Sequence, residues 1–109
     1  MTGAWANDLS ACEKIFTKKG GALVFKDKSD IYGSGFIVDR DQIRGRAARC
    51  RITSRKETGD VTHLLASCST DIMLSTIQFS VKVKNDNTIV RLFPGMEGLE
   101  LQYERCPAP

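Results

Sequence analysis

The sequence predicts a mainly β protein, with a short N-terminal helix followed by a seven- or eight-stranded antiparallel meander that closes as a small barrel or half-barrel. Two observations lead to this prediction. Most of the chain after residue 21 alternates between apolar and polar residues, and short polar turns separate the alternating segments. Such alternation indicates strands that bury one face and expose the other to solvent.

We expect a single domain that spans residues 1–109. A chain of this length can bury enough surface to fold alone, with a limited margin of stability. Hydrophobic residues make up 41% and charged residues 27% of the chain, which is typical of a globular protein and argues against global disorder. With three prolines and nine glycines, the chain holds no long flexible linker.

A short helix is predicted at residues 8–19. Ser10 followed by Glu13 fits a capping box at its beginning. Gly20 or Gly21 in "TKKGG" is suited to a C-terminal cap, because glycine adopts the left-handed backbone conformation without steric cost. The helix is therefore expected to end just before the first strand.

Strands are predicted from residue 22 to residue 105. The clearest is "STIQFSVKVK" at 75–84, where apolar and polar residues alternate. The strands at 47–56 and 61–68 are expected to form a hairpin across the turn "ETGD". The remaining strands are predicted at residues 22–26, 35–39, 88–93 and 98–104.

The four cysteines are Cys12, Cys50, Cys68 and Cys106. An even number of cysteines in a short chain is typical of a disulfide framework, and we predict two disulfides. None of the four lies in a Cys-x-x-Cys pair, so neither a redox couple nor a zinc site is expected. Disulfides persist in oxidising compartments, which favours a periplasmic or secreted protein.

The pairing of these cysteines has competing solutions. The interval from Cys12 to Cys50 equals the interval from Cys68 to Cys106, which favours a two-fold repeat with those two bridges. Hairpin geometry instead places Cys50 nearly opposite Cys68 across the turn. Four cysteines allow three connectivities, and spacing alone does not choose among them.

No recognisable catalytic or cofactor-binding motif occurs in the sequence. Its only histidine, His63, lies in mid-strand between Thr62 and Leu64, where a packed or half-exposed side chain is the commoner role. There is no nucleophile elbow, phosphate-binding loop or histidine-rich metal motif. We therefore expect a protein that is not an enzyme, with no metal and no cofactor.

The charge and hydropathy of the chain restrict its partners. The net charge of +3 is below that expected of a dedicated nucleic-acid-binding protein. No apolar run approaches the ~20 residues that span a bilayer. The beginning "MTGAWAND" lacks the basic and apolar regions of a signal peptide, as does a mature exported domain or a cytosolic protein.

A cluster of basic residues suggests a binding surface. Its candidate members are Arg44, Arg46, Arg49, Arg51 and Arg55. On a regular strand the last three share one face, and this positive stripe could bind phosphate, anionic lipid headgroups or an acidic partner. The alternative is a solvated face partly neutralised by nearby acidic residues. Aromatic residues do not interleave with the arginines, which argues against single-stranded nucleic acid.

The segment "SDIYGSGF" at 29–36 is a candidate binding loop. Tyr32, Ser34 and Gly35 could be presented outward on a rigid barrel. The alternative is that the glycines only accommodate a bend or bulge between strands.

The chain combines Trp5 in "GAWANDLSAC", a β-rich body with two internal cysteines, and a closing "YERCP". In these features it resembles small exported proteobacterial four-cysteine β-barrel domains of unknown function. The resemblance covers the whole chain. It implies a removed signal peptide and a disulfide-bonded barrel of lipocalin-like shape, and it implies no activity and no site residues. Trp5 is expected to pack as a plug over the open end of the barrel.

A weaker similarity concerns the periplasmic inhibitors of lysozyme, which are small disulfide-bonded barrels with a Ser-Gly-Tyr loop. "YGSGF" is similar to that loop, but Tyr32 precedes Ser34 and Gly35 instead of following them. Lysozymes are generally basic, so they would repel a chain of net charge +3 at long range.

The leading hypothesis is a non-catalytic periplasmic or secreted binding module for an unknown protein or an anionic envelope component. One alternative is an inhibitor of a cell-wall-directed enzyme such as lysozyme. Another is a carrier of a small apolar or anionic ligand. The carrier requires an internal cavity, whereas a small barrel is often filled by its own side chains.

Overall fold

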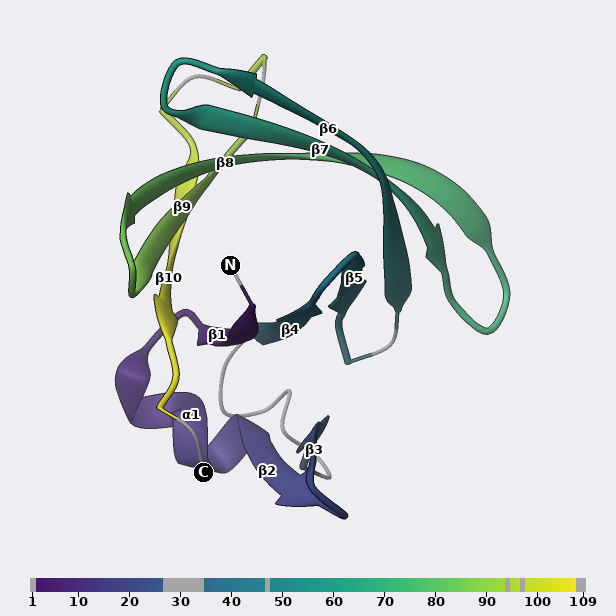
Figure 1. Cartoon of the computed structure of the whole chain (residues 1–109), viewed down its shortest axis with the longest axis vertical. Coiled ribbons are helices and arrows are strands. Elements are labelled where there is room, and N and C mark those ends of the chain that lie inside the picture. Colours follow the sequence, from purple (N-terminus) through teal and green to yellow (C-terminus); the bar gives the residue numbers. More distant parts are fainter. Residues whose placement is uncertain (1, 27–34, 47, 94, 97, 108–109) are drawn as a thin grey trace.

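The computed structural model describes residues 2–26, 35–46, 48–93, 95–96 and 98–107 (Figure 1). Over these residues, eight antiparallel strands form a closed barrel in the order β1-β10-β9-β8-β7-β6-β5-β4. A short helix and a separate two-stranded sheet lie beside the barrel (Figure 1). The mainly β fold class is confirmed, with a closed barrel in place of a half-barrel.

Seven barrel strands follow one another as a meander, and the N-terminal strand closes the ring by pairing with both β4 and β10. The bounds of the barrel strands are β1 (Gly3–Ala6), β4 (Gly35–Asp39), β5 (Gln42–Arg44), β6 (Arg49–Thr58), β7 (Val61–Ser69), β8 (Leu74–Asn85), β9 (Thr88–Leu92) and β10 (Glu100–Arg105). The other elements are the 3₁₀ turn η1 (Leu9–Ala11), the helix α1 (Cys12–Ile15), and the strands β2 (Phe16–Lys19) and β3 (Ala22–Phe25). In the part of the chain that is described, no helix is long and apolar enough to cross a membrane.

The predicted helix at 8–19 is wrong at its C-terminal end, because α1 ends at Ile15 and the next four residues form β2. Gly20 and Gly21, at φ 61° and 84°, connect β2 to β3 as a two-residue hairpin loop. Such a loop requires positive φ at both positions, which glycine supplies. The glycines therefore make a hairpin, and they do not cap a helix.

The beginning of the helical segment also differs from the predicted capping box. Asp8 is the N-cap, and its carboxylate accepts hydrogen bonds from the Ser10 backbone N–H and from the Ser10 hydroxyl, both at 2.9 Å. These bonds stabilise the charged form and lower the pKa of Asp8 below its ordinary value of 3.8.

Two predicted positions near the N-terminus are wrong. Residues 22–26 are not a barrel strand, since β3 pairs only with β2 among the described residues. The first barrel strand is instead β1, which contains Trp5. The Trp5 side chain is 1% exposed and packs in the barrel core with Val38 and Tyr103, so it lies on a wall strand and not on a segment outside the barrel.

The core has two parts, one on each face of the β1–β4 pair. Inward-facing Trp5 and Val38 belong to the barrel interior. The alternate residues Ala4, Ala6 and Ile37 face outward, where they pack against the helix and β2 through the residues Ala11, Cys12, Ile15, Phe16 and Cys106. Because successive strand residues point to opposite faces, these strands can be apolar on both sides.

All four cysteines form disulfides, as predicted. Cys50 lies opposite Cys68 in the β6–β7 register and bonds to it, which confirms the pairing expected from hairpin geometry. The pairing expected from a two-fold repeat is wrong, because Cys12 bonds to Cys106. The helix lies on the outer face of β1 beside the end of β10, and this brings the two distant cysteines together.

Candidate functional site

A cavity of about 270 Å³ lies between the inward-facing side chains of the barrel. Almost all of its wall is apolar, and among the described residues one charged side chain, Arg91, contributes to it. The complete lining is Gly35, Phe36, Ile43, Gly45, Ala48, Cys50, Leu64, Ile77, Phe79, Val81, Ile89, Arg91 and Tyr103. An apolar cavity with one convergent polar group is the usual form of a small-molecule site.

Strand alternation places these residues in the interior. In β8, Ile77, Phe79 and Val81 follow one another at every second position and all line the cavity. On the facing wall, the rings of Phe36 and Tyr103 meet edge to face, with their centroids 4.9 Å apart. This packing keeps the wall apolar and the space open.

Arg91 enters the interior by the same alternation, because Ile89 two residues earlier faces the core. Its guanidinium carbon lies 4.7 Å from the centre of the Phe79 ring and 4.8 Å from the centre of the Phe93 ring. Cation–π contacts of this kind stabilise a charge without giving it a hydrogen-bond acceptor.

The Nε atom of Arg91 is buried and has no hydrogen-bond partner among the described residues. Among the described residues, the ion pairs Arg51–Asp41 and Lys82–Asp60 do not involve Arg91. Arginine keeps its charge at every accessible pH and offers a planar set of donors that matches a carboxylate. Arg91 therefore brings a positive charge and a planar set of donors to the cavity, and its Nε–H has no acceptor among the described residues.

Sequence reasoning missed Arg91. The strand at 88–93 was predicted, and its alternation places Arg91 on the same face as Ile89 and Phe93. A lone charged residue on the apolar face of a predicted strand was the available signal, because a charge at an inward position needs a partner.

The predicted basic surface is divided in the structure. Arg44, Arg46 and Arg49 line one surface groove beside the ends of β3 and β7. Arg44 donates a hydrogen bond to the backbone carbonyl of Leu23 at 3.2 Å, so it also links β5 to the two-stranded sheet. The groove thus joins three of the five predicted arginines.

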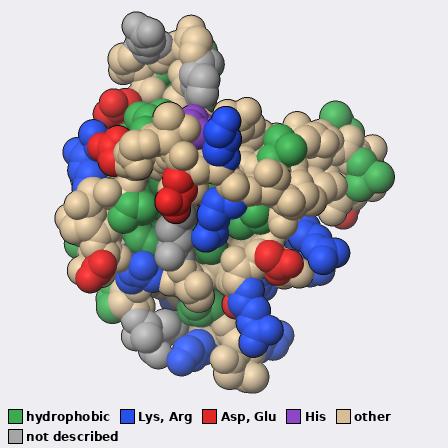
Figure 2. Space-filling view, turned by 45° about the horizontal axis from the view of Figure 1, so that its top comes forward, with side chains coloured by type: hydrophobic (Ala, Val, Ile, Leu, Met, Phe, Trp, Pro, Cys, Tyr) green, Lys and Arg blue, Asp and Glu red, His purple; other side chains and the backbone are tan. Residues whose placement is uncertain are grey.

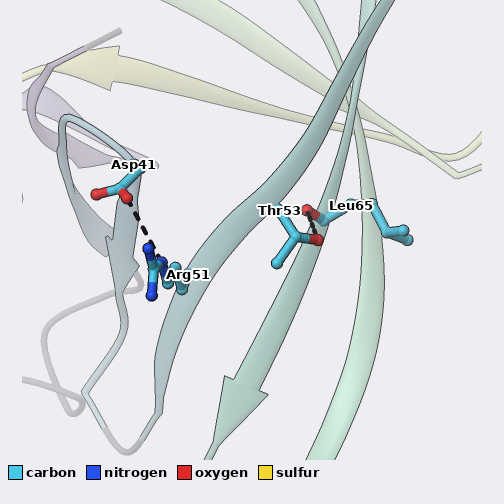
Figure 3. Close-up of polar contacts among 4 residues, drawn as sticks. All are labelled: Asp41, Arg51, Thr53 and Leu65. Atoms are coloured by element: carbon cyan, nitrogen blue, oxygen red, sulfur yellow. Dashed lines mark hydrogen bonds and ion pairs between the residues drawn. The ribbon is translucent and has the colours of Figure 1, made fainter.

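Arg51 lies apart from that groove and forms an ion pair with Asp41 at 3.6 Å (Figure 3). Both side chains are mostly exposed, and ion pairs in water contribute little to stability. This pair corresponds to the partial neutralisation expected for the basic face.

Arg55 does not share a face with Arg49 and Arg51, which corrects the predicted stripe. The β6–β7 register shifts between Ile52 and Ser54, and the Thr53 hydroxyl donates to the Leu65 carbonyl at 3.2 Å there (Figure 3). The extra residue reverses the alternation that follows it. Arg55 therefore lies opposite Leu64, which faces the interior, whereas Arg49 and Arg51 face outward.

Of the predicted binding loop, Tyr32 and Ser34 lie outside the described residues. Gly35 begins β4 opposite Ala6. A Cβ at Gly35 would lie 2.6 Å from the Trp5 carbonyl oxygen and 2.8 Å from the Phe16 ring. Close packing therefore accounts for a glycine at this position.

His63 lies on the outer face of β7, where its Nδ1 and the Ser80 hydroxyl share a hydrogen bond of 2.9 Å. Gln78 donates to the same hydroxyl at 3.4 Å, and Ser80 is 1% exposed. A serine nucleophile must reach its substrate, and a base must be oriented by a third group. Ser80 is buried, and within the described residues His63 is hydrogen-bonded to Ser80 and to no carboxylate. Within the described ranges, no group of three or more His, Cys, Asp or Glu residues could hold a metal ion.

Comparison with known proteins gives no match to a family model, to a curated protein or to a solved structure.

Proposed function

We propose that this protein is a non-catalytic binding module of the periplasm or the extracellular space whose barrel holds a small apolar molecule with one carboxylate. The observation that carries the proposal is Arg91, the one charged side chain among the described residues that line the apolar cavity, whose buried Nε–H has no acceptor. Of the three functions expected from the sequence, the carrier of a small apolar or anionic ligand is the one that the cavity favours.

The size of the cavity restricts the ligand. An apolar cavity of about 150 Å³ accommodates benzene, so about 270 Å³ accommodates roughly eleven non-hydrogen atoms. A medium-chain fatty acid such as octanoate, with about ten such atoms, meets this limit. Ligands of this size reach a Kd on the order of 10 µM when their apolar part is well buried.

The charge in the cavity restricts the ligand further. A hydrogen bond to a charged group contributes about 1.5–3 kcal/mol, and more is lost when a buried donor stays unpaired. A carboxylate at Arg91 would satisfy its Nε–H, while the alkyl chain would contact the aliphatic and aromatic lining. An uncharged molecule of the same shape would leave the donor unsatisfied, so it should bind more weakly.

The proposed compartment rests on the two disulfides. Disulfides in a small domain form and persist where the environment is oxidising, as in a periplasm or outside the cell. The resemblance to small exported barrel domains supports the same location.

The experiment is calorimetric titration of the intact, oxidised protein with octanoate, with octanol as the uncharged comparison. We expect octanoate to bind more tightly than octanol and Arg91→Met to remove this difference. Val81→Phe, which fills the cavity, should abolish binding of both molecules. The matched controls are Arg49→Met and Val83→Phe, because Arg49 and Val83 are exposed and do not line the cavity. Equal octanoate binding by wild type and Val81→Phe would exclude the cavity as the site.

A further inference from the structure

The tip of the β7–β8 hairpin exposes three consecutive large apolar side chains. Ile72 is 89%, Met73 61% and Leu74 82% exposed. Single exposed apolar residues are common on protein surfaces, whereas a contiguous group marks a site of interaction. The proposed ligand cavity does not include these residues, so they call for a separate explanation.

The hairpin tip extends beyond the barrel wall. Residues 74–79 of β8 pair with β7 only, because the pairing of β8 with β9 begins at Ser80. In Figure 1 this end of the hairpin projects on the right, away from the other strands. The turn is ordered by two backbone N–H donors: Thr70 donates to the Met73 carbonyl at 2.9 Å, and Met73 donates to the Thr70 hydroxyl at 3.1 Å.

Basic residues lie at the base of this tip. The groove lined by Arg44, Arg46 and Arg49 also includes Thr70 and the acidic residue Asp71. Three positive charges therefore face one negative charge beside the turn. Figure 2 shows hydrophobic side chains at the end of a projection on its right side, with basic and acidic side chains below it.

We propose that this hairpin tip docks on the surface of an anionic lipid bilayer. Ile72, Met73 and Leu74 enter the boundary between headgroups and acyl chains, and the three arginines of the groove bind lipid phosphates. Apolar residues that enter the bilayer, together with basic residues at headgroup level, are the two elements of reversible membrane binding.

The orientation of the tip residues favours a bilayer over a protein partner. Consecutive residues of a turn and strand point in different directions, so a groove on a folded partner would cover one side of the tip and leave another in water. A fluid acyl layer surrounds all of them. The basic residues on the barrel side then lie at the level of the charged headgroups.

The experiment is sedimentation of the full, oxidised chain with vesicles of phosphatidylcholine alone or mixed with phosphatidylglycerol. We expect binding to the mixed vesicles, little binding to the neutral ones, and a steep decrease at high salt. The double variant Ile72→Ser/Leu74→Ser should weaken binding about 100-fold, because two large apolar side chains no longer leave water. Arg46→Gln/Arg49→Gln should weaken it about 25-fold.

The matched control is Met96→Ser/Leu99→Ser, which removes exposed apolar side chains outside the tip. It should leave vesicle binding unchanged, and circular dichroism should show that all variants are folded. Inorganic phosphate that replaces sodium chloride at constant ionic strength separates lipid docking from a site for free anions, and it should release no more protein than the chloride does. Three results would overturn the proposal: no binding of the wild-type protein to either kind of vesicle, equal binding to both kinds, or an equal loss of binding in the control variant. If Ile72→Ser/Leu74→Ser still binds the mixed vesicles as the wild type does, the proposal is also overturned, and the tip is then better explained as a contact for another protein.

Discussion

Replacing Arg91 with methionine is expected to stabilise the ligand-free protein. The Nε–H of Arg91 is buried without an acceptor among the described residues. An unsatisfied buried donor costs about 1–3 kcal/mol, and methionine, which is apolar and of similar length, removes this cost.

Two opposing contributions determine the size of the effect. The variant loses the contacts of the guanidinium with the Phe79 and Phe93 rings, at 4.7 and 4.8 Å, each of which contributes about 0.5–1 kcal/mol. The methionine sulfur recovers about 0.3–1.5 kcal/mol against the same rings. Taking the middle of each range, removal of the unsatisfied donor is the largest effect, and the variant gains about 1 kcal/mol.

The assay is thermal unfolding with and without octanoate. Without ligand, a gain of about 1 kcal/mol raises Tm by roughly 4 °C in a chain of this size. Octanoate at a hundred times its Kd should stabilise the wild type by about 2.7 kcal/mol. The ligand should stabilise the variant much less, so the order of the two Tm values reverses when octanoate is added.

The result that would refute this reasoning is a variant that unfolds below the wild type in the absence of ligand. Arg91 would then be paired in solution, and its Nε–H would not be available to a ligand. An equal rise of Tm with octanoate in both proteins would place the carboxylate away from Arg91. Arg49→Met, at an exposed position on the barrel surface, should change neither Tm nor the effect of octanoate.

Three further predictions concern stability. Removing the Cys12–Cys106 disulfide by double alanine substitution should lower the free energy of unfolding in urea by about 4.7 kcal/mol, and removing Cys50–Cys68 should lower it by about 3.2 kcal/mol. The first loss is larger because the two bridges span 94 and 18 positions. The reverse order would contradict the loop-entropy argument. Gly35→Ala should lower the free energy of unfolding by about 1–3 kcal/mol, because its Cβ would meet the Trp5 carbonyl and the Phe16 ring, and an unchanged urea midpoint would show that the strand shifts without cost. Asp8→Ala should lower Tm at neutral pH. Because folding lowers the pKa of Asp8 from 3.8, the Tm difference from wild type should be complete above pH 3.8 and should disappear as the pH falls through the pKa of Asp8 in the folded protein. A Tm difference that is constant with pH would contradict a charged cap.

Much of the barrel could be predicted from local sequence. The strands predicted at 35–39, 61–68 and 75–84 occur with nearly the same bounds. Their alternation reflects burial of one face, which is a property of each strand by itself. The turn at Gly59 followed from the same local signals and placed Cys50 opposite Cys68.

Residues whose environment depends on distant segments were predicted less well. Ser80 is one of the polar residues of the alternation at 75–84, which predicts a solvated side chain, but it is buried and forms hydrogen bonds with His63 and Gln78. Val83 is one of the apolar residues of the same alternation, which predicts a buried side chain, but it is 46% exposed. In both cases exposure depends on which neighbouring strand or side chain lies alongside, and alternation within one strand does not contain that information.

The sequence by itself determined the β-rich class, the presence of two disulfides and most strand positions, because alternation, turn residues and cysteine number act locally. Only the tertiary structure decided that β1 closes the barrel, that Cys12 meets Cys106, and that a register shift turns Arg55 away from Arg49. The same holds for the candidate site. Arg91 becomes a ligand-binding candidate only because eight strands close around a cavity that it lines together with Phe79. No acidic residue is among the described residues that line this cavity. The physical reason is that a cavity, and the unmet hydrogen bond within it, arise from chain closure between segments far apart in sequence.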